Sequence, residues 1–279
     1  MAARIIDGKK LASEIKEDVR RKTAKLSFKP GLATIIVGSN PASKMYVSRK
    51  QEACAEAGFY SENFELPENV KEKDLISLIR KLNASRKIHG ILVQLPLPKH
   101  INAEKVMAAI SPERDVDGFH PLNMGRLMAG VESFAAATPK GIVRLLEECK
   151  INVKGKNVVI INHSTVVGKP LALMMLNRNA TVSVCHEYTK DLKEYTLKAD
   201  VLITAVGIPN LIKPDMVKQG VVVIDAGIAK IGDKTVGDVD FEGVSKKASW
   251  ITPVPGGVGP MTIASLLENT LLAAVKNKS

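Results

Sequence analysis

Aromatic residues are scarce in this sequence, and the signatures of several protein classes are missing from it. Only 4% of the 279 residues are aromatic, so the core must be largely aliphatic. No apolar run looks long enough to span a membrane, so we expect no membrane partner. The opening residues, MAARIIDGKKLASEIKED, lack the apolar stretch of a signal peptide.

The cysteine and histidine patterns show no sign of disulfides or of a metal site. Cys54, Cys149 and Cys185 are odd in number and far apart, and no Cys-x-x-Cys occurs. This usage is typical of reduced thiols and predicts a cytoplasmic protein. The five histidines show no spacing such as His-Glu-x-x-His, so we predict no metal site.

Positive charge is in excess, with a formal net charge of +11. Nucleic-acid binding is one explanation, but the basic residues are spread along expected helices and often adjoin Glu or Asp, as in KEKDLISLIRK. There is also little aromatic interleaving for base stacking. We therefore expect no nucleic-acid partner, and note that an anionic substrate or a nucleotide cofactor would profit from the same field.

Short β-branched runs alternate with amphipathic runs along the chain. Strands are expected at 32–38, 89–98, 157–162, 181–186, 200–207 and 220–227, and helices at 8–26, 42–58, 72–82, 103–110, 139–149, 169–177 and 261–275. This alternation predicts an α/β fold with parallel sheets covered by helices. The strand spacing shortens after Asn157 to that of a doubly wound, Rossmann-like nucleotide-binding sheet. We expect residues 1–120 plus a returning helix at 262–279 to form one domain, and residues 121–261 to form the second.

The segment NVVIINHSTVVGKPLALMML reads as strand, turn and helix. A helix N-terminus after a parallel strand favours anion binding, but only Gly168 is present and Gly-x-Gly-x-x-Gly is absent. A dinucleotide site and an ordinary strand-to-helix turn therefore both fit. Glu187 follows the next strand by one residue, where a carboxylate would accept from ribose hydroxyls and repel a 2′-phosphate, or would simply be a solvated loop residue. The expected strand at 200–207 ends with Thr204 and Gly207, and the strand at 220–227 ends in the segment DAGI, whose last residue is Ile228. Glycine-bearing turns at the carboxyl ends of parallel strands suit a bound ligand.

Three segments of the first part of the chain hold candidate reactive groups. Tyr46 and Lys50 are spaced i, i+4 and so share one helix face, although such a pair is more often a surface feature than a catalytic one. Gln94 ends a strand, where its amide would orient a lysine amine. Asp115 and Asp117 form either an acid–base pair or a cap with a solvated acid.

Several short segments follow one another along the chain in this order: YVSRK, QLPLP, DVDGFHPLNMGRL, TPKG, STVVGKP, NATVSVCH, VGDVD and ITPVPGGVGPMT. Together they resemble the bifunctional methylenetetrahydrofolate dehydrogenase/methenyltetrahydrofolate cyclohydrolase family, and the resemblance covers essentially the whole chain. The resemblance implies two α/β domains flanking a cleft and a homodimer. It also implies one-carbon chemistry: a nicotinamide cofactor oxidises 5,10-methylenetetrahydrofolate, and water then converts the methenyl form to 10-formyltetrahydrofolate.

The resemblance also assigns roles to residues. Lys50 matches the proton-transfer lysine, Tyr46 the aromatic that stacks on the folate, Gln94 the glutamine that tunes the lysine, and Asp117 the aspartate that binds the pterin edge. Further expected substrate-binding residues are Leu95, Pro255, Gly256 and Gly257, the last three lying in a ribbon where side chains would block a close approach. Expected cofactor-binding residues are His163, Ser164, Gly168, Glu187, Thr204, Gly207 and Ile228.

The sequence departs from the family pattern at the expected adenosine end of the cofactor. The family commonly has Gly-Arg-Ser where Asn162, His163 and Ser164 stand, and Ser where Glu187 stands. Both changes remove favourable contact with a 2′-phosphate. NADP is the family default, and these changes suggest that NAD is accepted well too.

Two competing functions stay open at this level. One is a dehydrogenase without effective cyclohydrolase activity, although Tyr46, Lys50, Gln94 and Asp117 are all present. The other is a non-catalytic nucleotide- or nucleic-acid-binding protein, which rests on charge alone and leaves TPVPGGVGPMT unexplained.

Overall fold

The computed structural model describes residues 3–277 and divides the chain into two compact units. Unit 1 consists of residues 1–12 and 138–262, and unit 2 of residues 13–137 and 263–279. The expected domains put residues 1–12 with the first domain and residues 121–137 with the second, so the compact units divide the chain differently at these segments. For the N-terminal segment the reason is structural, because Arg4–Ile5 pairs in parallel with Trp250–Ile251 of the unit 1 sheet.

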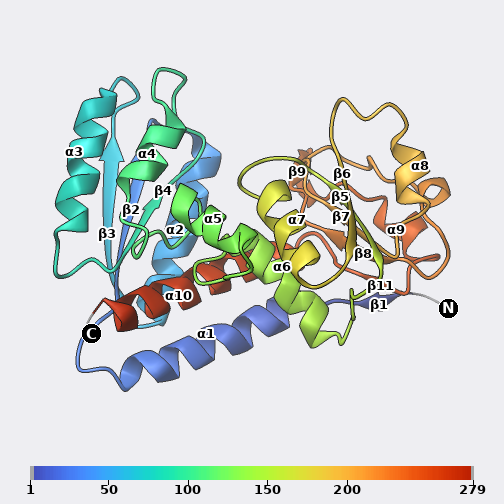
Figure 1. Cartoon of the computed structure of the whole chain (residues 1–279), viewed down its shortest axis with the longest axis horizontal. Helices are drawn as coiled ribbons and strands as arrows, with labels where there is room; N and C mark the ends of the chain where they lie inside the picture. The colour runs from blue at the N-terminus through green and yellow to red at the C-terminus, as the bar shows by residue number, and fades with distance from the viewer. Residues whose placement is uncertain (1–2, 278–279) are drawn as a thin grey trace. The chain divides into compact units, whose positions relative to one another are not determined.

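Unit 2 is built on a parallel sheet of three strands, in the order β3-β2-β4 (Figure 1). The strands are β2 (Gly31–Val37), β3 (Tyr60–Leu66) and β4 (Gly90–Val93). The associated helices are α2 (Pro41–Glu56), α3 (Glu72–Asn83), α4 (Ala103–Ala109) and α5 (Pro121–Met128). All seven residues of β2 are buried, as befits a central strand whose two faces are both covered.

Helix α3 shows why these sequences fold as they do. Leu75, Ile79 and Leu82 recur at helical spacing, and all three are buried in the core cluster of unit 2. Glu72 and Asp74 lie in the first turn and Arg80 and Lys81 in the last, which complements the helix dipole.

Unit 1 contains a parallel sheet of six strands, in the order β1-β11-β8-β7-β5-β6 (Figure 1). The strands are β1 (Arg4–Ile5), β5 (Asn157–Ile161), β6 (Thr181–Cys185), β7 (Val201–Thr204), β8 (Val222–Asp225) and β11 (Trp250–Ile251). The chain runs from β5 to β6 on one side and then crosses to β7 on the other. Ligands of doubly wound sheets bind at such a reversal, beyond the carboxyl ends of the strands.

The remaining elements are short, apart from three helices that cross the boundary between the units. The boundary falls within α1 (Gly8–Ala24), α6 (Ala137–Glu148) and α10 (Val258–Lys276). The other elements are α7 (Gly168–Asn177), α8 (Leu192–Thr196), α9 (Phe241–Val244), the 3-10 helix η1 (Pro214–Met216), and the antiparallel pair β9 (Ala229–Ile231) and β10 (Lys234–Val236).

Helix α10 corrects one sequence-based expectation. By length and composition it is apolar enough to cross a membrane, but 61% of its most apolar stretch is buried inside the structure. The burial is that of a core helix, which needs an apolar surface on most sides.

The doubly wound α/β architecture is confirmed, and every expected strand and helix is present with shifted ends. The pattern missed β3, whose sequence YSENFEL is rich in polar residues because it lies at a sheet edge. It also missed the two-residue strands β1 and β11, which are too short to show alternation.

Candidate active site and cofactor-binding site

Lys50 and Gln94 are in direct contact in unit 2. The Nζ atom of Lys50 donates to Oε1 of Gln94 at 3.1 Å, and Nε2 of Gln94 donates to the Leu95 carbonyl at 2.8 Å. Helix α2 carries Tyr46 and Lys50 on one face, while Gln94 directly follows β4 and its backbone N–H donates to Ile35. Because both groups of the Gln94 amide are engaged, its oxygen is fixed toward the lysine.

The neighbouring aspartates have different environments. Asp115 is buried and accepts from the backbone N–H groups of Gly118, Phe119 and His120 and from Nδ2 of Asn123, so it organises its own loop. Among the described residues no backbone N–H donates to Asp117 in this way, and its main electrostatic partner is Lys50. Of the two alternatives for this pair, the structure supports a capping role for Asp115 and leaves Asp117 available.

These surroundings shift the protonation equilibria of the cluster. Burial lowers the pKa of Lys50, an effect that the nearby Asp117 opposes. Burial raises the pKa of Asp117 to about 6, with Lys50 lowering it and Asp115 raising it further. Perturbed pairs of opposite charge are common in active sites, because proton transfer near neutral pH requires them.

Two further residues complete the description of this cluster. Tyr46 is half-buried and its pKa is raised by burial, so the phenol stays protonated at neutral pH. Cys54 lies one turn beyond Lys50 on α2, and burial raises its pKa to about 12, so it is a thiol without nucleophilic character. Leu95 is half-buried and packs against the core of unit 2.

The proline- and glycine-rich ribbon lies in unit 1, against the first residues of α1. The Gly256 carbonyl accepts from the Lys9 N–H at 2.8 Å, and a Cβ added at Gly8 would overlap the Gly257 carbonyl. Gly256 has φ of +112°, which side-chain-bearing residues rarely adopt. The close approach that the glycines permit is therefore at least in part that of the chain itself.

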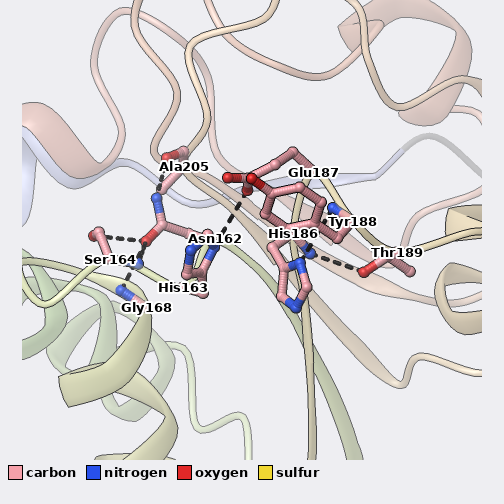
Figure 2. A network of polar contacts seen from close by, with 9 residues as sticks. All are labelled: Asn162, His163, Ser164, Gly168, His186, Glu187, Tyr188, Thr189 and Ala205. Atoms are coloured by element: carbon pink, nitrogen blue, oxygen red, sulfur yellow. Dashed lines mark hydrogen bonds and ion pairs between the residues drawn. The ribbon is translucent and has the colours of Figure 1, made fainter.

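Asn162 organises the turn between β5 and α7 (Figure 2). Its Oδ1 accepts from the backbone N–H of Ser164 at 2.8 Å, from the Ser164 hydroxyl at 2.7 Å and from the Gly168 N–H at 2.9 Å. Its Nδ2 donates to the Ala205 carbonyl at 2.6 Å, which ties the end of β5 to the end of β7. A Cβ at Gly168 would overlap Asn162, so this glycine is required by the turn itself.

Asp238 organises the loop after β7 in the same way, and it is not among the candidate residues predicted from the sequence. This fully buried carboxylate accepts from the Thr204 hydroxyl and from the N–H groups of Val206, Gly207 and Ile208, at 2.7–2.9 Å. Gly207 has φ of +80°. The motif VGDVD contains the only signal, an acid after a short hairpin, and nothing local indicates which loop it holds.

His163 and Glu187 meet beyond the ends of β5 and β6, as Figure 2 shows. The strand register pairs Ile161 with Cys185, and Nδ1 of His163 lies 3.4 Å from Oε2 of Glu187. Both side chains are exposed. In doubly wound sheets, an acidic residue at this position after the second strand accepts hydrogen bonds from the ribose hydroxyls of the cofactor.

The residues beyond the strands of unit 1 fit a dinucleotide. Val206, Ile208 and Ile228, which follow β7 and β8, are between 42% and 49% exposed. Aliphatic side chains left exposed at the carboxyl ends of parallel strands suit the flat faces of nucleotide rings. The backbone donors of Gly168 and Gly207, by contrast, are already engaged by Asn162 and Asp238.

Together the fold and the strand-end residues of unit 1 define an α/β protein of the dinucleotide-binding type. The family model for the catalytic domain of tetrahydrofolate dehydrogenase/cyclohydrolase matches residues 6–117, and the model for its NAD(P)-binding domain matches residues 136–278. The chain therefore belongs to the tetrahydrofolate dehydrogenase/cyclohydrolase family.

Individual relatives agree with this assignment over their full length. The bifunctional protein FolD of Methanosarcina barkeri is 56% identical over 279 residues, covering 99% of this chain and 97% of the relative. The crystal structure of the FolD methylenetetrahydrofolate dehydrogenase/cyclohydrolase of Campylobacter jejuni has a TM-score of 0.97 and 52% identity, with both chains fully covered. The Trypanosoma brucei enzyme, solved with NADP and an inhibitor, has a TM-score of 0.96 and 35% identity, covering 100% of this chain and 99% of that one.

The predicted activity is thus confirmed. The chain is a bifunctional enzyme that oxidises 5,10-methylenetetrahydrofolate with NAD(P) and hydrolyses the methenyl product to 10-formyltetrahydrofolate. The alternatives of a dehydrogenase alone and of a non-catalytic binding protein receive no support.

Proposed function

We propose that Lys50 is the proton-transfer residue of the cyclohydrolase step, with Gln94 and Asp117 setting its protonation. The 3.1 Å contact between Lys50 and Gln94 in a half-buried setting is the observation on which this proposal depends. An amine whose pKa is lowered by burial can take a proton from water as it adds to the methenyl carbon. Gln94 holds the amine in place through its oxygen without adding a charge that would keep it protonated.

The other substrate contacts are proposed from the same cluster. Asp117, when ionised, accepts hydrogen bonds from the N–H donors of the pterin edge. Tyr46, one helical turn before Lys50, stacks its ring on the folate. Leu95 lies next to Gln94, and Pro255, Gly256 and Gly257 remain proposed substrate-binding residues on the strength of the family resemblance.

We propose that unit 1 binds the dinucleotide, which supplies the hydride acceptor when bound. Ser164 and Gly168 position the turn after β5, Thr204 and Gly207 the loop after β7, and Ile228 offers apolar surface after β8. In unit 1, His163 and Glu187 lie beyond the adjoining strand ends, where an adenosine ribose is expected.

The exposed pair favours NAD at least as strongly as NADP. Glu187 presents a carboxylate that accepts from free ribose hydroxyls and repels a 2′-phosphate. His163 is held by Glu187 and is not an arginine, so the pair offers no permanent positive charge to a phosphate.

The remaining proposals concern assembly and location. We propose a cytoplasmic homodimer that uses no nucleic-acid or membrane partner. The family resemblance supports the dimer, the three unpaired cysteines suit a reducing compartment, and the buried surface of α10 makes a membrane role unnecessary.

The test is a pair of separate assays on the purified protein. Dehydrogenase activity is measured with 5,10-methylenetetrahydrofolate and either NAD or NADP, and hydrolysis is measured with 5,10-methenyltetrahydrofolate alone. The proposal predicts both activities, with a kcat/KM for NAD that equals or exceeds the value for NADP. A strong preference for NADP would contradict the role given to Glu187, and hydrolysis unaffected by Lys50→Met would contradict the role given to Lys50.

A further inference from the structure

His163, His186 and Glu187 form a cluster whose nitrogen and oxygen atoms can converge on one ion (Figure 2). One potential ligand atom from each residue lies within 4.8 Å of the other two. The histidine spacing in the sequence predicts no metal site, since no pattern such as His-Glu-x-x-His occurs and His163 lies far along the chain from His186 and Glu187. The parallel register of β5 and β6 brings them together, since Ile161 pairs with Cys185.

The spacing of the cluster already approaches that of a tetrahedral metal site. Ligands at about 2.0–2.1 Å from a zinc ion lie about 3.3 Å from one another in tetrahedral geometry. Nδ1 of His163 and Oε2 of Glu187 are 3.4 Å apart. The His163 and His186 rings are 4.8 Å apart between centroids, in a tilted edge-on arrangement, so a small rotation of exposed side chains completes the set.

His186 is partly oriented by its own turn. Its Nδ1 accepts from the Tyr188 N–H at 3.2 Å, and its backbone N–H donates to the Thr189 hydroxyl at 2.9 Å. At 3.2 Å the first of these lies at the upper end of the ordinary hydrogen-bond range, and a metal ion bound at Nδ1 would replace it. The backbone contact with Thr189 would still hold His186 while its ring exchanges the Tyr188 N–H for the metal ion.

We propose that these three residues bind a divalent transition-metal ion, with Zn²⁺ as the representative. Two imidazoles and one carboxylate are a donor set that zinc prefers, whereas Mg²⁺ and Ca²⁺ select oxygen ligands. The fourth position is left to water or to another ligand. Cys185, which precedes His186 in the chain, is buried and is not one of the three converging residues.

Zinc binding and dinucleotide binding are then mutually exclusive. This second half of the inference rests on the proposed cofactor site, because His163 and Glu187 are the residues assigned there to the ribose. A metal held by both side chains removes the carboxylate oxygens from the ribose hydroxyls. The predicted consequence is inhibition of the dehydrogenase by zinc that is competitive with NAD.

The test is a calorimetric titration of the purified, cofactor-free chain with ZnCl₂, repeated for His186→Asn and for His100→Asn as the matched control. His100 is an exposed histidine of unit 2, outside the cluster. We expect one tight site in the wild type, weakening by about tenfold or more in His186→Asn and unchanged in His100→Asn. Absence of binding, or equal binding by His186→Asn, would overturn the metal site.

The same titration in the presence of saturating NAD tests the overlap. We expect a weaker apparent affinity for zinc when NAD is present. Zinc binding that depends on His186 but is indifferent to NAD would overturn the overlap and the ribose assignment, while leaving the metal site intact. The variants are compared by thermal unfolding as well, so that a folding defect is not mistaken for a lost ligand.

Discussion

The Lys50 cluster of unit 2 and the strand-end turns of unit 1 use polar groups in opposite ways. In the first, Lys50 and Asp117 are half-buried, oppositely charged and incompletely satisfied, so their proton equilibria are displaced toward neutral pH. In the second, the carboxylate of Asp238 and the amide of Asn162 are saturated with hydrogen bonds, and fix backbone loops.

Under the proposed roles, this difference in hydrogen bonding separates the groups that react from the groups that shape the cofactor site. Groups that exchange protons must be able to change charge, which requires an environment that does not fully satisfy either form. Groups that shape a binding surface perform best when every donor and acceptor is paired. Substitutions in the first set should therefore alter rates and pH dependence, and those in the second should alter cofactor affinity.

The largest effect is expected for Lys50→Met. Removing the amine should lower the cyclohydrolase kcat by about 100-fold or more, because general acid–base groups contribute that much. The dehydrogenase should retain a larger share of its rate, since hydride transfer does not use the same proton. Parallel assays of both activities check this. An equal loss of both activities would contradict a role for Lys50 that is specific to the cyclohydrolase step.

Asp117→Asn should change activity and stability in opposite directions. Burial raises the Asp117 pKa from an ordinary 3.8 to about 6, so its ionisation destabilises the folded state. This group's contribution to stability is fully present below pH 4 and is lost as the pH rises through about 6. The asparagine variant should therefore gain more in Tm at pH 8 than at pH 4.

The same substitution should raise the KM for the folate substrate. In the wild type, KM should fall as the pH rises through about 6, because the ionised carboxylate is the acceptor, and the variant should lack this inflection. A variant that is less stable at pH 8, with an unchanged KM profile, would show that Asp117 is structural.

Asp238→Asn tests the strand-end turns of unit 1, where Asp238 is saturated with hydrogen bonds. The amide can accept at only one of the two positions, so at least one N–H of the loop after β7 is left unpaired. We expect the KM for NAD or NADP to rise by about tenfold while cyclohydrolase activity is retained. Circular dichroism and thermal melting accompany the kinetics. A loss of both activities together would point to a general folding defect.

The smallest effect is expected for Glu187→Ser, at the exposed pair. Exposed charge pairs contribute about 1 kcal/mol at most, so the ratio of kcat/KM for NADP to that for NAD should rise about fivefold. The Tm should not change, because Glu187 is solvent-exposed. An unchanged cofactor ratio would mean that the carboxylate points away from the ribose.

How far the sequence predicts this molecule differs between the two regions. The i, i+4 spacing of Tyr46 and Lys50 places them on one face of α2, and the strand that ends before Gln94 is a strong β-branched run, so the first cluster follows from local pattern and resemblance. The link from Asp238 to the loop after β7 spans about 30 residues, and periodicity carries no information about such a partner. The contact between Gly168 and Asn162 is likewise not visible in the local pattern, which shows only a glycine at the start of a helix.

The most direct test of the central claim is the titration of the Lys50 amine itself, followed by NMR of the isotope-labelled lysine side chains. The Lys50 signal is identified by its absence from Lys50→Met. The account predicts that Lys50 titrates well below the ordinary lysine value of about 10.4, and that Gln94→Ala broadens or shifts its signal. A Lys50 that titrates at or above the ordinary value would contradict its role as a base, and with it the division between reaction and recognition.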